Sequence, residues 1–286
     1  MISVGIMAGL IAMLCWGVGD FLFSIPTKKL GALKTIVFFN IFSVITALPY
    51  ILYIFNSLNI TITNLILLFV AVIIDAVAIF YFLRAFEIGE VSIVAPISAG
   101  YSLVTVILAI IFLGEILNLS KFIAILIIII GLVFTSTDIR KLKHIYTALG
   151  VKESFVAMMA WGIYFFIIGI VSKTMDYKNL FVFTTVLLAI VFAIFAIIKR
   201  VKVGKKDLHQ KGILPIFIVT SIIYTIAWFV INYGITQDLV SLVTPISSLY
   251  PAITVILAVV FYKEKLVMNQ KLGILAILAG LFLISI

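Results

Sequence analysis

The stretch VSIVAPISAGY, residues 91–101, occurs a second time with small changes as VSLVTPISSLY, residues 240–250. The likeness continues past both tyrosines, because TVILA follows at 105–109 and again at 254–258. Over residues 91–109 and their counterparts 149 positions later, twelve of nineteen positions are identical. Such a match indicates an internal duplication, and the arrangement of the two copies decides the fold.

The duplication extends over the rest of the chain. Glu115 falls on Glu264 at the same offset. Near the start of each half, AMLCWG at 12–17 matches AMMAWG at 157–162 at an offset of 145, so a loop differs in length by four residues. We therefore predict two repeats, residues 1–137 and 149–286.

The composition is that of a membrane protein. Hydrophobic residues make up 65% of the chain, charged residues 11%, and the mean hydropathy is +1.38. Apolar runs of about twenty residues, the length that crosses a bilayer core, recur along the whole chain. There are ten of them: 3–24, 34–55, 63–86, 91–113, 119–137, 149–172, 179–198, 212–235, 240–262 and 268–286. We predict one all-α integral membrane protein with ten transmembrane helices.

Five crossings in each repeat predict that the second repeat enters the membrane upside down. The charges agree with this, because the first, third, fifth, seventh and ninth connections hold 17 of the 20 Lys and Arg residues. Equivalent connections of the two halves thus have opposite charge bias, which inverted repeats require. By the positive-inside rule, the count places both termini outside.

Several other classes of protein are excluded or disfavoured. The net charge of +9 comes from basic residues in the connections, so no nucleic-acid partner is expected. Cys15 is the single cysteine, which rules out an intrachain disulfide and a cysteine metal cluster. No Walker A loop occurs, and we expect no cofactor and no metal. The first apolar run lacks a basic leader and is interpreted as a retained helix.

The combined pattern resembles the drug/metabolite transporter superfamily, and within it the EamA-like family. It is carried by two five-helix halves, a Trp-Gly at 16–17 and 161–162, and proline-containing segments followed by Glu115 and Glu264. The resemblance covers essentially the whole chain. It implies secondary transport of amino acids, metabolites or drug-like solutes, more often export than uptake. Some relatives are described with cytoplasmic termini, so the orientation stays open.

Asp75 lies near the middle of the apolar run 63–86. An ionisable side chain at that depth costs free energy and therefore indicates a functional or structural role. It is interpreted as a proton-titrating or cation-binding group that faces an internal cavity. The alternative is a carboxylate buried against another helix and hydrogen-bonded there.

The run 212–235 carries Tyr224, at the position equivalent to Asp75, together with Trp228 and Asn232 at four-residue spacing. This polar and aromatic stripe predicts a wet central cavity, with hydrogen bonding between helices as the alternative. We expect the runs 63–86 and 212–235 to face each other across the site.

Trp16 and Trp161 occupy equivalent positions and are candidate lining residues. Asp20 lies one turn beyond Trp16 and near the predicted end of its helix, so both a cavity gate and an ordinary interfacial carboxylate are open. Phe165 stands at the equivalent position in the second half. The charged residues at the helix ends, Arg84, Glu87, Glu115, Lys263, Glu264 and Lys265, are interpreted as topology anchors.

Pro96 and Pro245 each fall on the sixth residue of the duplicated segment and predict a helix bend. Past the bend, hydroxyl groups share one helix face in both copies, at Ser98 and Tyr101 and at Ser247 and Tyr250. These are candidate substrate-binding residues. A packing kink whose hydroxyls bond back to the helix is the alternative.

The sequence therefore predicts a transporter that moves a small solute across the cell membrane by alternating access. It is not expected to be an enzyme. Coupling to protons through Asp75 is a hypothesis, and the small-residue pairs Gly5/Gly9 and Ala276/Gly280 can pack helices within the chain or in a homodimer.

Two other classes are weighed against the transporter. A non-transporting scaffold or receptor is the first. The second is an intramembrane aspartyl protease of the GxGD type, suggested by GVGD at 17–20 with Asp75 as a second carboxylate. The order of the two aspartates is reversed from that of such proteases, which disfavours this hypothesis.

Overall fold

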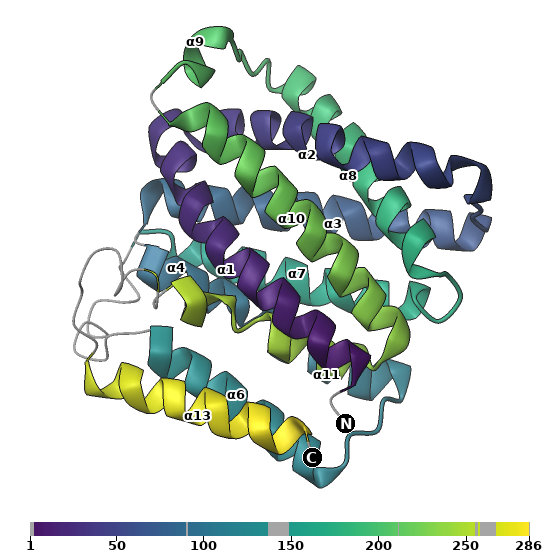
Figure 1. The fold of residues 1–286 in the computed structure, drawn as a ribbon, viewed down its shortest axis with the longest axis vertical. Coiled ribbons are helices and arrows are strands. Elements are labelled where there is room, and N and C mark those ends of the chain that lie inside the picture. Colours follow the sequence, from purple (N-terminus) through teal and green to yellow (C-terminus); the bar gives the residue numbers. More distant parts are fainter. Residues whose placement is uncertain are drawn as a thin grey trace.

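The computed structural model describes residues 3–89, 91–136, 149–210, 212–254, 257 and 267–285. In the order of the chain its α-helices are α1 (Val4–Leu30), α2 (Ala32–Ile54), α3 (Ile62–Ile88), α4 (Val91–Ala99), α5 (Tyr101–Leu108), α6 (Leu119–Ser136), α7 (Val151–Val171), α8 (Tyr177–Ile198), α9 (Lys205–Leu208), α10 (Ile213–Gln237), α11 (Val240–Ser247) and α13 (Met268–Ser285). A 3₁₀ turn, Phe55–Ser57, follows α2, and a π-helical turn, Ala109–Leu113, ends α5. The two termini lie near each other (Figure 1).

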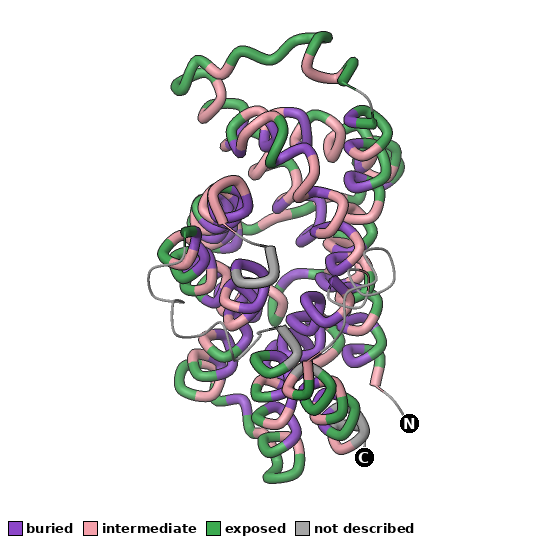
Figure 2. The backbone as a smooth tube through the Cα atoms, turned by 90° about the vertical axis from the view of Figure 1, so that its left-hand side faces the viewer, coloured by how far each residue is buried: buried purple, intermediate pink, exposed green. Residues whose placement is uncertain are grey.

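Seven described helices are long and apolar enough to cross a membrane, with mean hydropathies from 1.9 to 3.0. Three shorter apolar helices, Leu119–Phe134, Val240–Thr254 and Lys271–Gly280, lie in the other three predicted runs. The prediction of an all-α membrane protein is confirmed. Figure 2 shows why such helices associate: buried residues gather on the faces that point into the bundle, and exposed residues lie on the outward faces.

The helices pair in a regular way. α1 packs along α10, α3 packs along α7, and α6 packs along α13. In Figure 1, α6 and α13 lie side by side at one end of the molecule, apart from the long helices. The small-residue pairs serve packing within the chain. A Cβ atom added at Gly5, Gly9 or Gly280 would lie only 2.4, 3.0 or 2.7 Å from the side chain of Asp238, Ile246 or Ile128.

The duplicated stretches form interrupted helices. The chain is helical through Pro96 as α4 and through Pro245 as α11, and a turn follows at Gly100 and at residues 248–249 before the helix resumes. Each break comes three or four residues after the proline, whereas the carbonyl that the proline leaves without a partner lies four residues before it.

Each Trp-Gly pair packs against the duplicated stretch of the other half. Thr105 donates a hydrogen bond to the carbonyl oxygen of Gly162 at 3.1 Å, and Thr254 donates one to that of Gly17 at 3.2 Å. A Cβ atom on Gly17 would lie 2.7 Å from the carbonyl oxygen of Tyr250. The glycines thus allow a close backbone approach that no other residue permits.

Glutamates at helix ends cap other helices. Glu115 is buried, and its two carboxylate oxygens accept hydrogen bonds from the amides of Val240 and Ser241 at 3.3 and 3.0 Å. α11 begins inside the protein, where its free amides need such an acceptor. Glu87 accepts from the amide of Ala32 at 3.2 Å and pairs with Arg84 at 2.9 Å. Glu115 and Glu87 therefore cap other helices. Their interpretation as topology anchors did not include this capping role.

The other predicted anchors are Lys263, Glu264 and Lys265, and they lie outside the described residues.

Candidate substrate cavity

A cavity lies between the long helices, lined by residues of α1, α2, α3, α5, α7, α8 and α10 and by Tyr250. The volume of the cavity that water can enter is about 100 Å³. One water occupies roughly 10–15 Å³ on this measure, so the cavity holds several waters or a small solute. Neither α6 nor α13 contributes to the lining described here, in keeping with their place at the edge of the bundle (Figure 1).

Asp75 lines this cavity. It is only 3% exposed, and its carboxylate accepts a hydrogen bond from the indole nitrogen of Trp161 at 2.9 Å. Asp75 lies halfway along α3 and Trp161 halfway along α7, the helices that pack together across the two halves. The bond thus joins one half of the chain to the other at the depth of the cavity.

Asp20 lines the same cavity and is also 3% exposed. The hydroxyl of Tyr224 on α10 donates a hydrogen bond to its carboxylate. The prediction that Asp20 lies near a helix end was wrong, because α1 continues to Leu30, ten residues further. A helix ends where its backbone hydrogen bonds end, and hydropathy alone placed that end too early.

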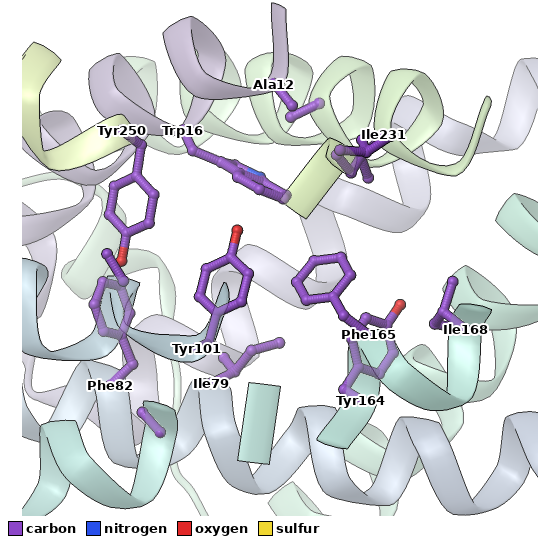
Figure 3. Packing of buried hydrophobic residues seen from close by; sticks show 14 of the residues in the cluster. Ala12, Trp16, Ile79, Phe82, Tyr101, Tyr164, Phe165, Ile168, Ile231 and Tyr250 are labelled. Atoms are coloured by element: carbon purple, nitrogen blue, oxygen red, sulfur yellow. The ribbon is translucent and has the colours of Figure 1, made fainter. Parts of the chain in front are cut away.

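Aromatic rings make up more than half of the lining. Trp16 packs edge-on against Trp228 at 5.3 Å and against Tyr250 at 6.4 Å between ring centres. Tyr101 stacks on Phe165 at 5.0 Å. Figure 3 shows Trp16 and Tyr250 entering from one side while Tyr101 and Phe165 point toward them from the other.

Most hydroxyl groups of the duplicated stretches donate to backbone carbonyl oxygens, and two pairs of hydroxyls bond to each other. The Tyr101 hydroxyl lies 3.0 Å from that of Ser247, and the Tyr250 hydroxyl donates to the carbonyl oxygen of Ala95 at 3.3 Å. Ser98 is fully buried, and its hydroxyl has no hydrogen-bond partner in the described part of the chain. Of these predicted residues the two tyrosines line the cavity, while Ser98 and Ser247 do not.

The predicted stripe on α10 is divided in the same way. Tyr224 and Trp228 line the cavity. Asn232 is buried but lies outside the lining, and its amide nitrogen has no hydrogen-bond partner among the described residues.

The predicted site residues included none from α2 or α8, although both helices line the cavity. From α2 come Asn40 and Ser43, and from α8 come Thr184 and Thr185. The hydroxyl of Ser43 is buried without a hydrogen-bond partner in the part of the chain that is described. The signal was present, because Asn40 and Ser43 are polar residues three positions apart inside an apolar run.

The side chains of the lining include acids but no bases among the described residues. Asp20 and Asp75 are its only ionisable residues other than tyrosines, since no Lys, Arg or His is among the lining residues of the described chain. The basic residues lie at the ends of the helices, as in the ion pair between Lys34 and Asp207 at 2.7 Å. The hydrogen bond from Lys34 holds the pKa of Asp207 below its usual range. No group of three potential metal ligands occurs in the described residues.

Comparison with known proteins agrees with this architecture. The model of the EamA-like transporter family matches residues 3–137 and again residues 149–286. An uncharacterised protein of Methanocaldococcus jannaschii is 34% identical over 104 residues, which are 36% of this chain and 76% of that protein.

A protein of known crystal structure is similar at 15% identity and a TM-score of 0.73, over 99% of this chain and 96% of its own. At that identity the likeness concerns the fold alone. The family match, which spans nearly the whole chain, carries the assignment: this multi-pass membrane protein belongs to the EamA-like transporter family, within the drug/metabolite transporter superfamily.

Proposed function

We propose that the chain is a secondary transporter that moves a small metabolite across the cell membrane by alternating access, in the direction of export. The observation that carries this proposal is the buried cavity, to which both halves of the chain contribute polar and aromatic side chains. Small-molecule sites are typically concave, largely apolar and equipped with a few convergent polar groups.

Alternating access requires two inverted halves that can rock about one site. The helix contacts support this arrangement, because exchanging the two halves turns the packing of α1 on α10 into that of α7 on α3. The hydrogen bonds from Thr105 to Gly162 and from Thr254 to Gly17 are related by the same exchange. We therefore treat residues 1–137 and 149–286 as two inverted five-helix repeats.

The interrupted helices supply the means of movement. The turns at Gly100 and at residues 248–249 divide two crossings into shorter pieces. Each piece can tilt with its neighbours without breaking a continuous ladder of hydrogen bonds. The cavity is then open to one side of the membrane at a time.

Asp75 is the candidate for proton coupling. It is buried at mid-helix and hydrogen-bonded to Trp161 across the two halves, so a change in its charge acts on a contact between them. The other titratable groups of the lining are Asp20 and the tyrosines Tyr101, Tyr164, Tyr224 and Tyr250.

The protease hypothesis fits this site poorly. Two catalytic aspartates would have to share a proton and a water. Here each carboxylate is bonded to an aromatic donor of its own, Asp75 to Trp161 and Asp20 to Tyr224. A scaffold or receptor needs no buried cavity with two acids, so the transporter remains the better account of these residues.

The test is flux into liposomes that contain the purified protein. A panel of metabolites is first screened by thermal shift, and the stabilising compounds are then followed as they cross the membrane. We expect at least one of them to enter these liposomes faster than it enters protein-free liposomes. Its entry should be faster still when a proton gradient drives protons out of the liposomes. Absence of flux for every stabilising compound would contradict the proposal.

Coupling is tested with Asp75→Asn, which keeps an acceptor for Trp161 but cannot take up a proton. We expect the variant to lose the response to the gradient, while Asp207→Asn, an acid outside the cavity, keeps it. Normal gradient-driven flux in Asp75→Asn would show that protons do not act through this residue.

A further inference from the structure

The chemistry of the cavity lining identifies a class of substrate. We propose that the transported solute is an organic cation, an amine or quaternary ammonium with an apolar body, held between Asp20 and Asp75 and against the aromatic rings. This rests on the proposed function, since it concerns what the same cavity carries.

Charge is the first step. The lining holds the carboxylates of Asp20 and Asp75 and no Lys, Arg or His in the described chain. At the low effective dielectric of a membrane interior, an anionic solute would face two carboxyl groups and no cationic side chain that compensates its charge. A zwitterion would leave its own carboxylate without a cationic partner. A solute with net positive charge can pair with these carboxyl groups and needs no further charged side chain.

Unused hydrogen-bonding capacity is the second step. An ionised carboxylate offers about four acceptor positions. The recorded side-chain donors are Trp161 on Asp75 and the Tyr224 hydroxyl on Asp20, one for each carboxylate. Both acids therefore keep acceptor capacity toward the cavity, and Ser43 adds a buried hydroxyl without a protein partner among the described residues.

The aromatic rings are the third step. Tryptophan and tyrosine faces attract cations, and the attraction is strongest where water is excluded. Trp16, Trp161 and Trp228 all line the cavity, together with tyrosines that include Tyr101 and Tyr250. Such a lining binds the positive charge and the apolar body of one solute at the same time. The cavity volume of about 100 Å³ suits a small cation.

The tryptophans also provide the measurement. All three tryptophans of the chain line this cavity, so their fluorescence reports on its occupation. The purified protein is titrated with benzyltrimethylammonium, a permanent cation that exchanges no proton. Benzyl alcohol, phenylacetate and zwitterionic phenylalanine are the neutral, anionic and zwitterionic comparisons, and excitation at the red edge of the band avoids tyrosine.

We expect benzyltrimethylammonium to change the fluorescence at concentrations about tenfold or more below those of the other three compounds, as charge-assisted contacts predict. Asp20→Asn and Asp75→Asn should each weaken its binding by about tenfold. Asp207→Asn removes an acid outside the cavity and should leave the binding unchanged.

Two results overturn the inference. One is binding of phenylacetate, phenylalanine or benzyl alcohol as tight as that of the cation. The other is a cation affinity unchanged in both cavity variants, with folding checked by gel filtration and by the emission maximum. Either result leaves the transporter proposal standing if liposome flux is present. A lack of flux contradicts the transporter itself, so the two failures are distinguishable.

Discussion

The two carboxylates of the cavity occupy different helices yet are held in the same way. Asp75 on α3 is bonded to Trp161 on α7, and Asp20 on α1 is bonded to Tyr224 on α10. The two helix pairs are equivalent under exchange of the halves, and Tyr224 stands at the position of Asp75. The acid thus lies on the third helix of its half in one contact and on the first helix in the other, and Asp20 and Trp161 are not at equivalent positions.

The packing framework shows no such change. Thr105 bonds to Gly162 in one contact and Thr254 bonds to Gly17 in the other, with the same residue types on the same sides. The framework is copied because both halves must pack at the same close distance. The cavity is free to differ because one solute is not symmetric. We therefore expect framework variants to act alike in the two halves.

The glycines of the framework should give the largest effect. A Cβ atom at Gly17 would lie 2.5 Å from the Cβ atom of Ile253, and one at Gly162 would lie 2.4 Å from that of Val104. Gly17→Ala and Gly162→Ala should each cost about 1–3 kcal/mol through overpacking and lower the melting temperature by similar amounts.

Gly204→Ala is the control for both, because no atom lies within 4 Å of its added Cβ. A melting temperature lowered in only one of the two glycine variants would break the equivalence of the framework.

The donors of the two carboxylates come next. Trp161→Phe and Tyr224→Phe keep a ring but remove the hydrogen bond to Asp75 or Asp20, which should cost about 1–2 kcal/mol in stability. Tyr233→Phe, on α10 and outside the lining, is the control. The affinity for benzyltrimethylammonium, measured by fluorescence in each variant, would show whether the two acid–donor pairs contribute equally to binding. Unchanged stability in both variants would mean that these bonds contribute little.

The threonines of the framework should give a smaller effect. Thr105→Val and Thr254→Val remove one hydroxyl each at nearly constant volume, and hydrogen bonds between membrane helices are worth about 0.6 kcal/mol on average. We expect equal, small decreases in thermal stability and an additive double variant. A much larger loss at one position would show that the two contacts are not equivalent.

The ion pair between Lys34 and Asp207 should have the smallest effect. The pKa of Asp207 is lowered by Lys34, so its contribution is present above the usual carboxyl pKa and is lost as the pH falls through the lowered value. Because Lys34 is exposed and the pair lies at the surface, where salt screens it, Asp207→Asn should leave the melting temperature at neutral pH almost unchanged. A clear loss at neutral pH would show that this contact holds the bundle together.

The sequence by itself determined the class of protein and its internal duplication. The length and hydropathy of the apolar runs predicted membrane helices, because a chain in lipid must satisfy its backbone within helices. The matching stretches include residues that the structure brings together, such as Gly17 and Thr254, but the sequence did not predict that contact. The isolated aspartates also marked the cavity, since lipid does not tolerate such groups without a reason.

Only the tertiary structure decided which face of each helix points inward. Lipid and packed protein are equally apolar, so the periodicity that reveals the buried face of a soluble helix is weak here. For this reason the lining residues of α2 and α8 were missed, and Ser98, Ser247 and Asn232 were predicted to line a cavity that they do not reach. The partners of Asp20 and Asp75 lie 204 and 86 residues away, and only folding brings them together.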